Sequence, residues 1–201
     1  ESTATLMDSV FTDNVAAYAG GGLASTLTEQ AQSADVCMDT FEFSGNVAGH
    51  SGGGVSLDGD GAFDVTMTDV DFQENLANKY GAGAFRLNSD YGGSTWTMDG
   101  GSFVGNSCPN MASAVHLGAD EWDPLSYIHA TLDGVLVDAN EANEGGAILN
   151  GHACELTLTD CTITGNAGDA VYLWDEPTSL VTSVTPPVDP IVPAPIVPDR
   201  G

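Results

Sequence analysis

The stretch Phe72-Gln-Glu-Asn75, followed by Gly81-Ala-Gly-Ala-Phe85, decides the fold, because its pattern returns along the whole chain. The repeated asparagines are Asn14, Asn46, Asn75, Asn106, Asn140 and Asn166. The residues three positions before them are Phe11, Phe43, Phe72, Phe103, Val137 and Ile163. Consecutive asparagines are 32, 29, 31, 34 and 26 residues apart, so six units account for residues 3 to 175. Repeats of this length indicate a solenoid whose units share one core.

Alignment on the asparagine gives further columns of matching residues. The position eight residues before the Asn is always Leu or Met, and the position two residues after it is always small. A small-residue patch that ends in an apolar residue follows, as in Gly52-Gly-Gly-Val55 and Gly145-Gly-Ala-Ile148. We expect the Gly runs to allow close approach of neighbouring coils, where side chains do not fit. Each unit reads as three short strands, the first with period-2 alternation. The sequence therefore predicts an all-β fold, a parallel β-helix of about six coils.

A C-terminal segment breaks this pattern. Residues 186–198 are rich in Pro, Ile and Val, which favours an extended polyproline II-like conformation. We expect a repeat domain over residues 1–177 and an extended Pro-rich tail over 178–201. The tail is either a spacer or a packing segment for a neighbouring subunit, and the residues that would pack are Pro186, Ile191, Val192, Ile196 and Val197.

The pairing of Phe-x-x-Asn with Gly145-Gly-Ala-Ile148 resembles the polymorphic outer membrane protein repeat first noted in Chlamydia. The resemblance covers residues 3 to 175 and rests on structural motifs, so it speaks for the fold more than for a function. It implies a right-handed parallel β-helix. It also implies an extracellular or cell-surface location on a bacterium, often an adhesive role and often a longer parent chain.

Charge narrows the range of partners. The chain has 29 Asp and Glu against 3 Lys and Arg, which gives a formal net charge of −26. A nucleic-acid partner is excluded, because phosphate binding requires Lys and Arg. No apolar run approaches the ~18 to 20 residues of a membrane helix, so we expect no membrane insertion. Cations, neutral glycans, basic proteins or further copies of the chain fit better.

Acidic residues also recur with the repeat. Six or seven residues before each Asn stand Asp8, Asp39, Asp69, Asp99, Asp133 and Asp160. We expect them to form one corner column with roughly 4.8 Å between neighbours, relieved by cations, by salt or by splaying into water.

The turn Asp58-Gly-Asp60-Gly has a spacing typical of Ca²⁺ loops but lacks the distal Glu of an EF-hand. Two interpretations stay open, a solvated acidic turn and a Ca²⁺ site formed by Asp58, Asp60, Asp64 and Asp69.

The remaining polar and aromatic motifs each have a structural and a functional interpretation. The six asparagines form either an internal hydrogen-bonded ladder, which we favour, or ligand sites. Trp122 and Tyr127, together with Tyr91 in the preceding coil, either form a recognition surface or cover the side of the coil. Cys108, at the small interior position, is expected to be a buried free thiol.

These observations favour a non-catalytic extracellular structural or adhesive protein, displayed on a bacterial surface or assembled end to end into a filament. One alternative is a glycan- or host-binding adhesin that uses the loop aromatics. The other is a polysaccharide lyase or glycoside hydrolase on a β-helix, although a lyase needs a basic residue and the repeat region has only Lys79 and Arg86.

Overall fold

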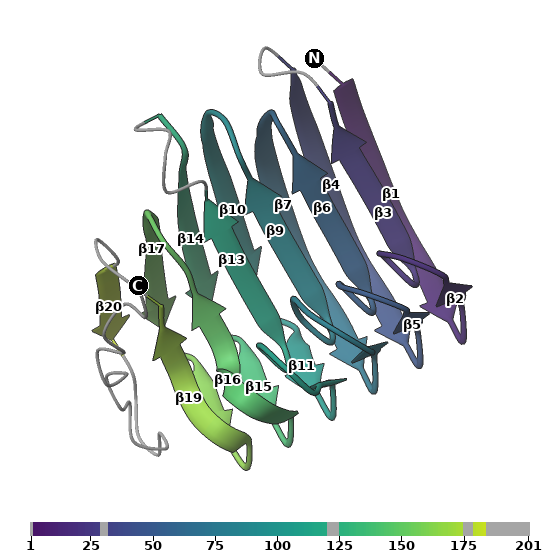
Figure 1. The fold of residues 1–201 in the computed structure, drawn as a ribbon, viewed down its shortest axis with the longest axis vertical. Coiled ribbons are helices and arrows are strands. Elements are labelled where there is room, and N and C mark those ends of the chain that lie inside the picture. Colours follow the sequence, from purple (N-terminus) through teal and green to yellow (C-terminus); the bar gives the residue numbers. More distant parts are fainter. Residues whose placement is uncertain (1, 29–31, 120–124, 175–178, 184–201) are drawn as a thin grey trace, which may run out of the picture.

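The computed structural model describes residues 2–28, 32–119, 125–174 and 179–183, and within these ranges the chain forms β-strands and no helix. The strands form two parallel sheets that stack in sequence order, as the colour gradient of Figure 1 shows. The first sheet contains β1 (Ser2–Thr12), β4 (Ser33–Ser44), β7 (Ala62–Gln73), β10 (Gly93–Asp99), β11 (Ser102–Val104), β14 (Tyr127–Asp133), β15 (Leu136–Asp138), β17 (Cys154–Thr159), β18 (Thr162–Thr164) and β20 (Ser179–Ser183). The second sheet contains β2 (Val15–Ala16), β3 (Leu23–Leu27), β5 (Val47–Ala48), β6 (Val55–Gly59), β8 (Leu76–Ala77), β9 (Phe85–Ser89), β12 (Ser107–Cys108), β13 (Val115–Ala119), β16 (Glu141–Asn150) and β19 (Ala167–Leu173).

The coils stack in the register that the sequence columns predict. The apolar residues eight positions before each Asn pair from strand to strand in the order Leu6, Met38, Met67, Met98, Leu132 and Leu158. This series joins β1, β4, β7, β10, β14 and β17, which are six coils separated by five steps. The predicted parallel β-solenoid is confirmed. Beyond it, β20 pairs with β17, and the predicted boundary between residues 177 and 178 stays a prediction.

The first two strands of each predicted unit are joined more closely than expected. In β1, β4 and β7 they form one long strand that bends at a residue with positive φ. The bend residues of the six coils are Asp8, Thr40, Asp69, Gly100, Gly134 and Asp160, with φ between 48° and 68°. In the later coils the chain is divided at this point into pairs such as β10 and β11. The bend is thus a constant of the repeat, although only Gly adopts this conformation without strain.

The predicted column of aspartates is wrong. Asp39 pairs with Thr68, and Asp99 pairs with both Thr68 and Asp133, all at the last strand position before the bend. Asp8, Asp69 and Asp160 instead occupy the bend itself. At this position the coil after Asp8 has Thr40 and the coil after Asp69 has Gly100, while no described residue follows Asp160. A one-residue difference in spacing from the Asn separates these two positions. The carboxylates are therefore divided between two positions, and only Asp99 and Asp133 face each other directly, so mutual repulsion is lower than a single column would give.

The core combines the phenylalanine column with the glycine runs. The ring centroids of Phe43 and Phe72 are 5.0 Å apart, those of Phe72 and Phe103 are 4.8 Å apart, and both pairs are stacked. A Cβ atom on Gly54 would lie 2.9 Å from the Phe72 ring, and one on Gly53 would lie 2.2 Å from the Gly83 carbonyl oxygen. The predicted close approach of coils at the glycine runs is confirmed. Glycine there makes room for both the backbone of the next coil and the stacked rings.

The residue before each ladder asparagine also has positive φ. Gly45, Gly105 and Gly165 fill this position in three coils, whereas Ala139 has φ 54° without any side-chain hydrogen bond to offset the strain. We expect Ala139→Gly to raise the free energy of unfolding by about 0.5 kcal/mol, since relief of left-handed strain exceeds the added entropy of the unfolded chain.

Urea unfolding of the two proteins measures this difference. Ala130→Gly is the matched control, because Ala130 is buried in the middle of β14 without positive φ, and it should be destabilised. Equal destabilisation of both variants would show that Ala139 is not strained.

Candidate functional site

The asparagines lie one above another inside the solenoid and form a continuous ladder. The Nδ2 of Asn46 donates to Oδ1 of Asn75 at 2.9 Å, and the Nδ2 of Asn75 donates to Oδ1 of Asn106 at 3.0 Å. The same contact joins Asn14 to Asn46, Asn106 to Asn140 and Asn140 to Asn166, at 2.9 to 3.0 Å. The ladder asparagines of the central coils are fully buried.

Each carboxamide also binds the backbone of its neighbours. The backbone N–H of Asn75 donates to Oδ1 of Asn106 at 2.9 Å, so that oxygen accepts two bonds from the preceding coil. The Nδ2 of Asn75 donates its second proton to the carbonyl of Phe43 at 2.8 Å. All the hydrogen-bonding capacity of the amide NH₂ and carbonyl is therefore used within the fold, and none is left for a ligand.

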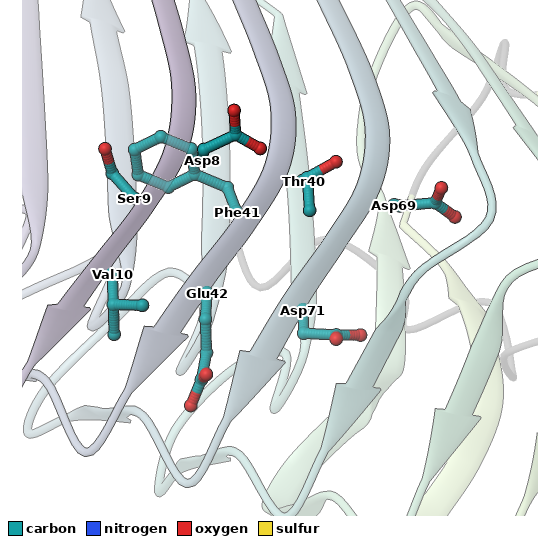
Figure 2. Close-up of a pocket in the computed structure, with 8 residues that line it drawn as sticks. All are labelled: Asp8, Ser9, Val10, Thr40, Phe41, Glu42, Asp69 and Asp71. Atoms are coloured by element: carbon teal, nitrogen blue, oxygen red, sulfur yellow. The ribbon is translucent and has the colours of Figure 1, made fainter.

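An acidic groove lies at the bend of the first three coils. Its volume is about 380 Å³, and Figure 2 shows the residues that line it, from β1, β4 and β7. The lining residues are Asp8, Ser9, Val10, Thr40, Phe41, Glu42, Asp69 and Asp71. Asp71 accepts a hydrogen bond from the Ser102 hydroxyl at 2.6 Å. The groove presents carboxylates and hydroxyls to solvent without a basic residue, which suits a cationic or hydroxyl-rich contact.

The four aspartates proposed for Ca²⁺ are not brought together. Asp58 lies in β6, Asp60 lies in the turn that follows, and Asp64 accepts a hydrogen bond from Thr95 Oγ1 at 2.6 Å. Asp69 lies five residues further along β7, about 16 Å away for an extended strand, and lines the acidic groove. Across the described ranges, no group of three or more His, Cys, Asp or Glu residues is arranged to hold a metal ion. Ca²⁺ binding stays a prediction.

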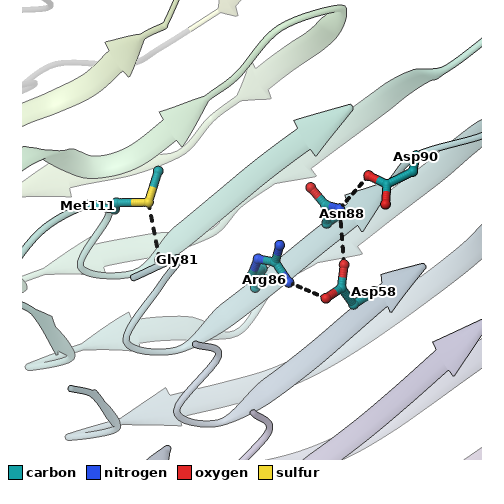
Figure 3. Close-up of polar contacts among 6 residues, drawn as sticks. All are labelled: Asp58, Gly81, Arg86, Asn88, Asp90 and Met111. Carbon is teal, nitrogen blue, oxygen red and sulfur yellow. Dashed lines mark hydrogen bonds and ion pairs between the residues drawn. The ribbon is translucent and has the colours of Figure 1, made fainter. Parts of the chain in front are cut away.

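Asp58 instead belongs to a polar cluster on the second sheet. Figure 3 shows its carboxylate between Arg86, whose guanidinium lies 2.7 Å away, and Asn88, whose Nδ2 donates at 3.0 Å. Asn88 Nδ2 also donates to Asp90 at 2.8 Å. Gly81 lies beside the Arg86 stem and donates its N–H to the sulfur of Met111. The Arg86 charge is thus engaged within the fold.

His116 is buried next to Arg86 on the neighbouring strand. Burial, and to a smaller extent the Arg86 charge, lowers the pKa of His116 from 6.5 to about 3. The imidazole is neutral at physiological pH, and its Nδ1 has no hydrogen-bond partner in the described part of the chain. This position is a structural one, in a column that continues with the buried Leu149.

The loop aromatics Tyr127 and Tyr91 differ in their contacts and in their exposure to solvent. The ring of Tyr127 lies over Gly93 of the preceding coil, where a Cβ would meet it, and remains 42% exposed. Tyr91 is half-buried in the turn before β10. The hydroxyl of Ser126 donates to the Ser89 carbonyl at 2.6 Å and ties the two loops together. Trp122 and the five tail residues named above, from Pro186 to Val197, lie outside the described residues.

A second row of aromatic rings, formed by Tyr18, His50 and Tyr80, has no regular spacing in the sequence. Tyr18 and His50 stack with centroids 4.7 Å apart, and Tyr80 follows at 5.4 Å from His50. Tyr18 and His50 both stand four residues after their Asn, but Tyr80 stands five after, which hides the column. The Tyr80 ring is tilted by 58° against His50, and Tyr18 and Tyr80 remain 66% and 46% exposed.

The cysteines are free thiols. Cys108, Cys154 and Cys161 are buried and Cys37 is exposed, which confirms the expectation for Cys108. Burial raises the pKa of Cys108 and Cys161, and that of Cys154 to about 12. The buried thiols are therefore poor nucleophiles and metal ligands at neutral pH.

Coils in register, an internal asparagine ladder and stacked phenylalanines define a parallel β-solenoid built from Phe-x-x-Asn repeats. The chain is homologous to the "Probable outer membrane protein PmpG" of Chlamydia muridarum (strain MoPn / Nigg), with 30% identity over 202 residues. The match covers 83% of the chain but only 20% of PmpG, so the chain spans about one fifth of that relative's length. The resemblance inferred from the motifs is confirmed, and the relative's name agrees with the expected cell-surface location.

No protein-family model matches the chain, and no solved structure matches it either. Among the described residues, no helix is long and apolar enough to span a membrane.

The ladder should be most sensitive to substitution at its centre. Asn75→Ala removes the acceptor for two Asn46 donors and the donor to the buried Phe43 carbonyl. We expect a loss of about 3 kcal/mol or more in the free energy of unfolding, because buried groups are left unpaired. Urea unfolding measures this loss.

Asn14→Ala is the matched control. Asn14 is exposed and loses only its Nδ2 bond to Asn46, so the cost should stay below about 1 kcal/mol. Similar costs at both positions would argue against a cooperative internal ladder.

His116 should make stability depend on pH. Its folded pKa lies below the unfolded value, so its contribution is fully present above about pH 6.5 and is lost as pH falls toward 3. His116→Leu removes this dependence, and we expect a flatter stability curve between pH 6.5 and 4, with a difference of about 1 kcal/mol or more at pH 5. Parallel curves for both proteins in chemical unfolding would contradict the buried neutral imidazole.

Proposed function

We propose that this chain is a non-catalytic structural or adhesive segment displayed on a bacterial cell surface. The observation that carries the proposal is the unbroken ladder of asparagines from Asn14 to Asn166, whose buried carboxamides bond to one another and to the backbone and leave no amide group for a ligand. The result is a rigid rod that presents its outer faces and loops, a form that suits display and contact. Homology to an outer membrane protein supports the location.

Self-assembly into a filament is the first candidate for what this surface segment does. Within the described residues β1 pairs along one edge, with β4, and four large apolar residues of this first coil are exposed by 57 to 78%, namely Met7, Val10, Val15 and Tyr18. Asn14 Oδ1 accepts no hydrogen bond from the described residues, whereas its counterparts in later coils accept two each. This end therefore offers the contacts that another coil of the same kind would complete, which supports end-to-end stacking.

The adhesive alternative uses loop aromatics such as Tyr127 and Tyr91 to bind a glycan or a host protein. The enzymatic alternative is weaker, because a lyase would need a basic residue beside its substrate. Of the two in the repeat region, Arg86 is paired with Asp58 and Lys79 lies over the Tyr80 ring. A screen of uronate polymers for unsaturated products should give no absorbance change above background.

Sedimentation and electron microscopy of the chain, with and without Ca²⁺, test the assembly. We expect rods that lengthen with concentration, and Val15→Arg at the exposed edge should shift them to monomers. Leu125→Arg is the control, since Leu125 is 69% exposed but lies away from the first coil. A wild-type monomer at all concentrations would remove the filament role but leave surface display, which antibody labelling of intact cells measures separately.

A further inference from the structure

The outer face of the first sheet carries a column of threonines along the solenoid axis. It lies nine residues before each ladder Asn and consists of Thr5, Cys37, Thr66, Thr97, Thr131 and Thr157, paired in register from strand to strand. These residues lie on β1, β4, β7, β10, β14 and β17, which form a row in Figure 1. Neighbouring strands are about 4.8 Å apart, so the side chains repeat at that interval, with the Cys37 thiol in place of a hydroxyl in the second coil. All six side chains face solvent, and only Thr157 is half-buried.

The hydroxyls of this column are available to a ligand. Those of Thr66, Thr97 and Thr131 make no hydrogen bond to any other residue that the structure describes. Threonines of the adjacent column do make such bonds, since Thr95 donates to Asp64 at 2.6 Å and Thr3 donates to Asp35 at 3.4 Å. A free hydroxyl can both donate and accept. The column is thus a regular series of unpaired groups held on a rigid sheet.

Carboxylates flank the threonines on both sides. Two residues along each strand, about 6.6 Å away, lie Asp35, Asp64 and Glu155 on one side and Asp39, Asp99 and Asp133 on the other. Lys79 and Arg86 belong to the other side of the coil, so no Lys or Arg interrupts this face in the described residues. Carboxylates only accept hydrogen bonds, which favours a ligand rich in hydroxyl donors and without negative charge.

One end of this face adds an aromatic contact. Tyr127 and His129 point outward from β14, with ring centroids 4.9 Å apart, and Tyr127 is 42% exposed. The apolar C–H face of a pyranose packs well against such rings.

The geometry points to a binding site for a neutral, extended polysaccharide that runs along the solenoid axis over the threonine column. Sugar hydroxyls donate to the flanking carboxylates and exchange hydrogen bonds with the threonines, while the charge of −26 repels uronates and polyphosphates. The sugars of an extended hexose chain follow one another at an interval similar to the strand spacing, so successive sugars meet successive coils. This inference rests on the proposed adhesive role. The proposed binding site lies on a face of the first sheet, whereas the adhesive alternative above uses the loops.

The test replaces hydroxyls without changing shape or strand preference. Thr66→Val, Thr97→Val and Thr131→Val are combined in one variant, because Val is β-branched like Thr and keeps the fold. The matched control combines Thr12→Val, Thr26→Val and Thr164→Val, three strand positions outside the column. Binding is measured by depletion from suspensions of insoluble cellulose and chitin and with soluble alginate, at low and high salt.

We expect the wild type and the control variant to bind at least one neutral polymer at both salt concentrations and not to bind alginate. The column variant should bind at least tenfold more weakly, since each net hydrogen bond is worth roughly fivefold in affinity. Unchanged binding by the column variant overturns the proposal, as does binding to alginate alone or to no polymer. Thermal hysteresis of ice growth without glycan binding would assign the column to ordered water and likewise overturn it. Surface labelling of cells is unaffected by these outcomes, so the proposed function is judged independently.

Discussion

The hydrogen bond from one asparagine carboxamide to the next is the interaction on which the rest of the solenoid depends. From Asn46 onward, each ladder oxygen accepts from both the side chain and the backbone N–H of the preceding Asn, so it fixes the position of the turn as well as the side chain. The residue before the Asn has positive φ in every coil, a conformation that the chain holds because the Asn is anchored on both sides. Strand register, the phenylalanine stack and the glycine contacts all follow from this anchoring, since a shift of one residue in any coil would break two hydrogen bonds and misplace a ring.

Much of this architecture could be predicted because it repeats. The Leu and Met column, the phenylalanines and the asparagines recur at constant distances from one another along the sequence. In a parallel solenoid, residues at equivalent positions of successive repeats stack on one another, so the constant spacing predicts the contacts. The aspartates were misplaced because Asp39 and Asp69 differ by one residue in their distance to the Asn, and in a strand one residue changes the face and the function of a position. The Arg86 pair with Asp58 could not be predicted, since the partners are 28 residues apart and no periodic signal joins them. The threonine column could be found from spacing alone, but threonine is common on strand surfaces, and only the free hydroxyls in the structure distinguish it.

Charge is distributed unevenly around the coil. The first sheet carries carboxylates and hydroxyls on its outer face and lines the acidic groove at its bend. Arg86, in contrast, lies in the second sheet and is paired there. The molecule therefore has an acidic side on the first sheet and a second side where Ala82, Ala112, Leu149, Met111 and Tyr172 form a small apolar cluster. A partner that approaches from solution meets two chemically different surfaces on the same rod.

The direction of the ladder has a consequence for how such a rod can grow. In every step the donors belong to the earlier coil and the acceptor to the later one. Among the described residues, the side-chain carbonyl of Asn14 accepts no hydrogen bond, while the amide of Asn166 donates to the carbonyls of Val137 and Thr164. Addition of coils, whether by a longer chain or by another molecule, has only one productive orientation, and two first coils brought face to face would set acceptor against acceptor.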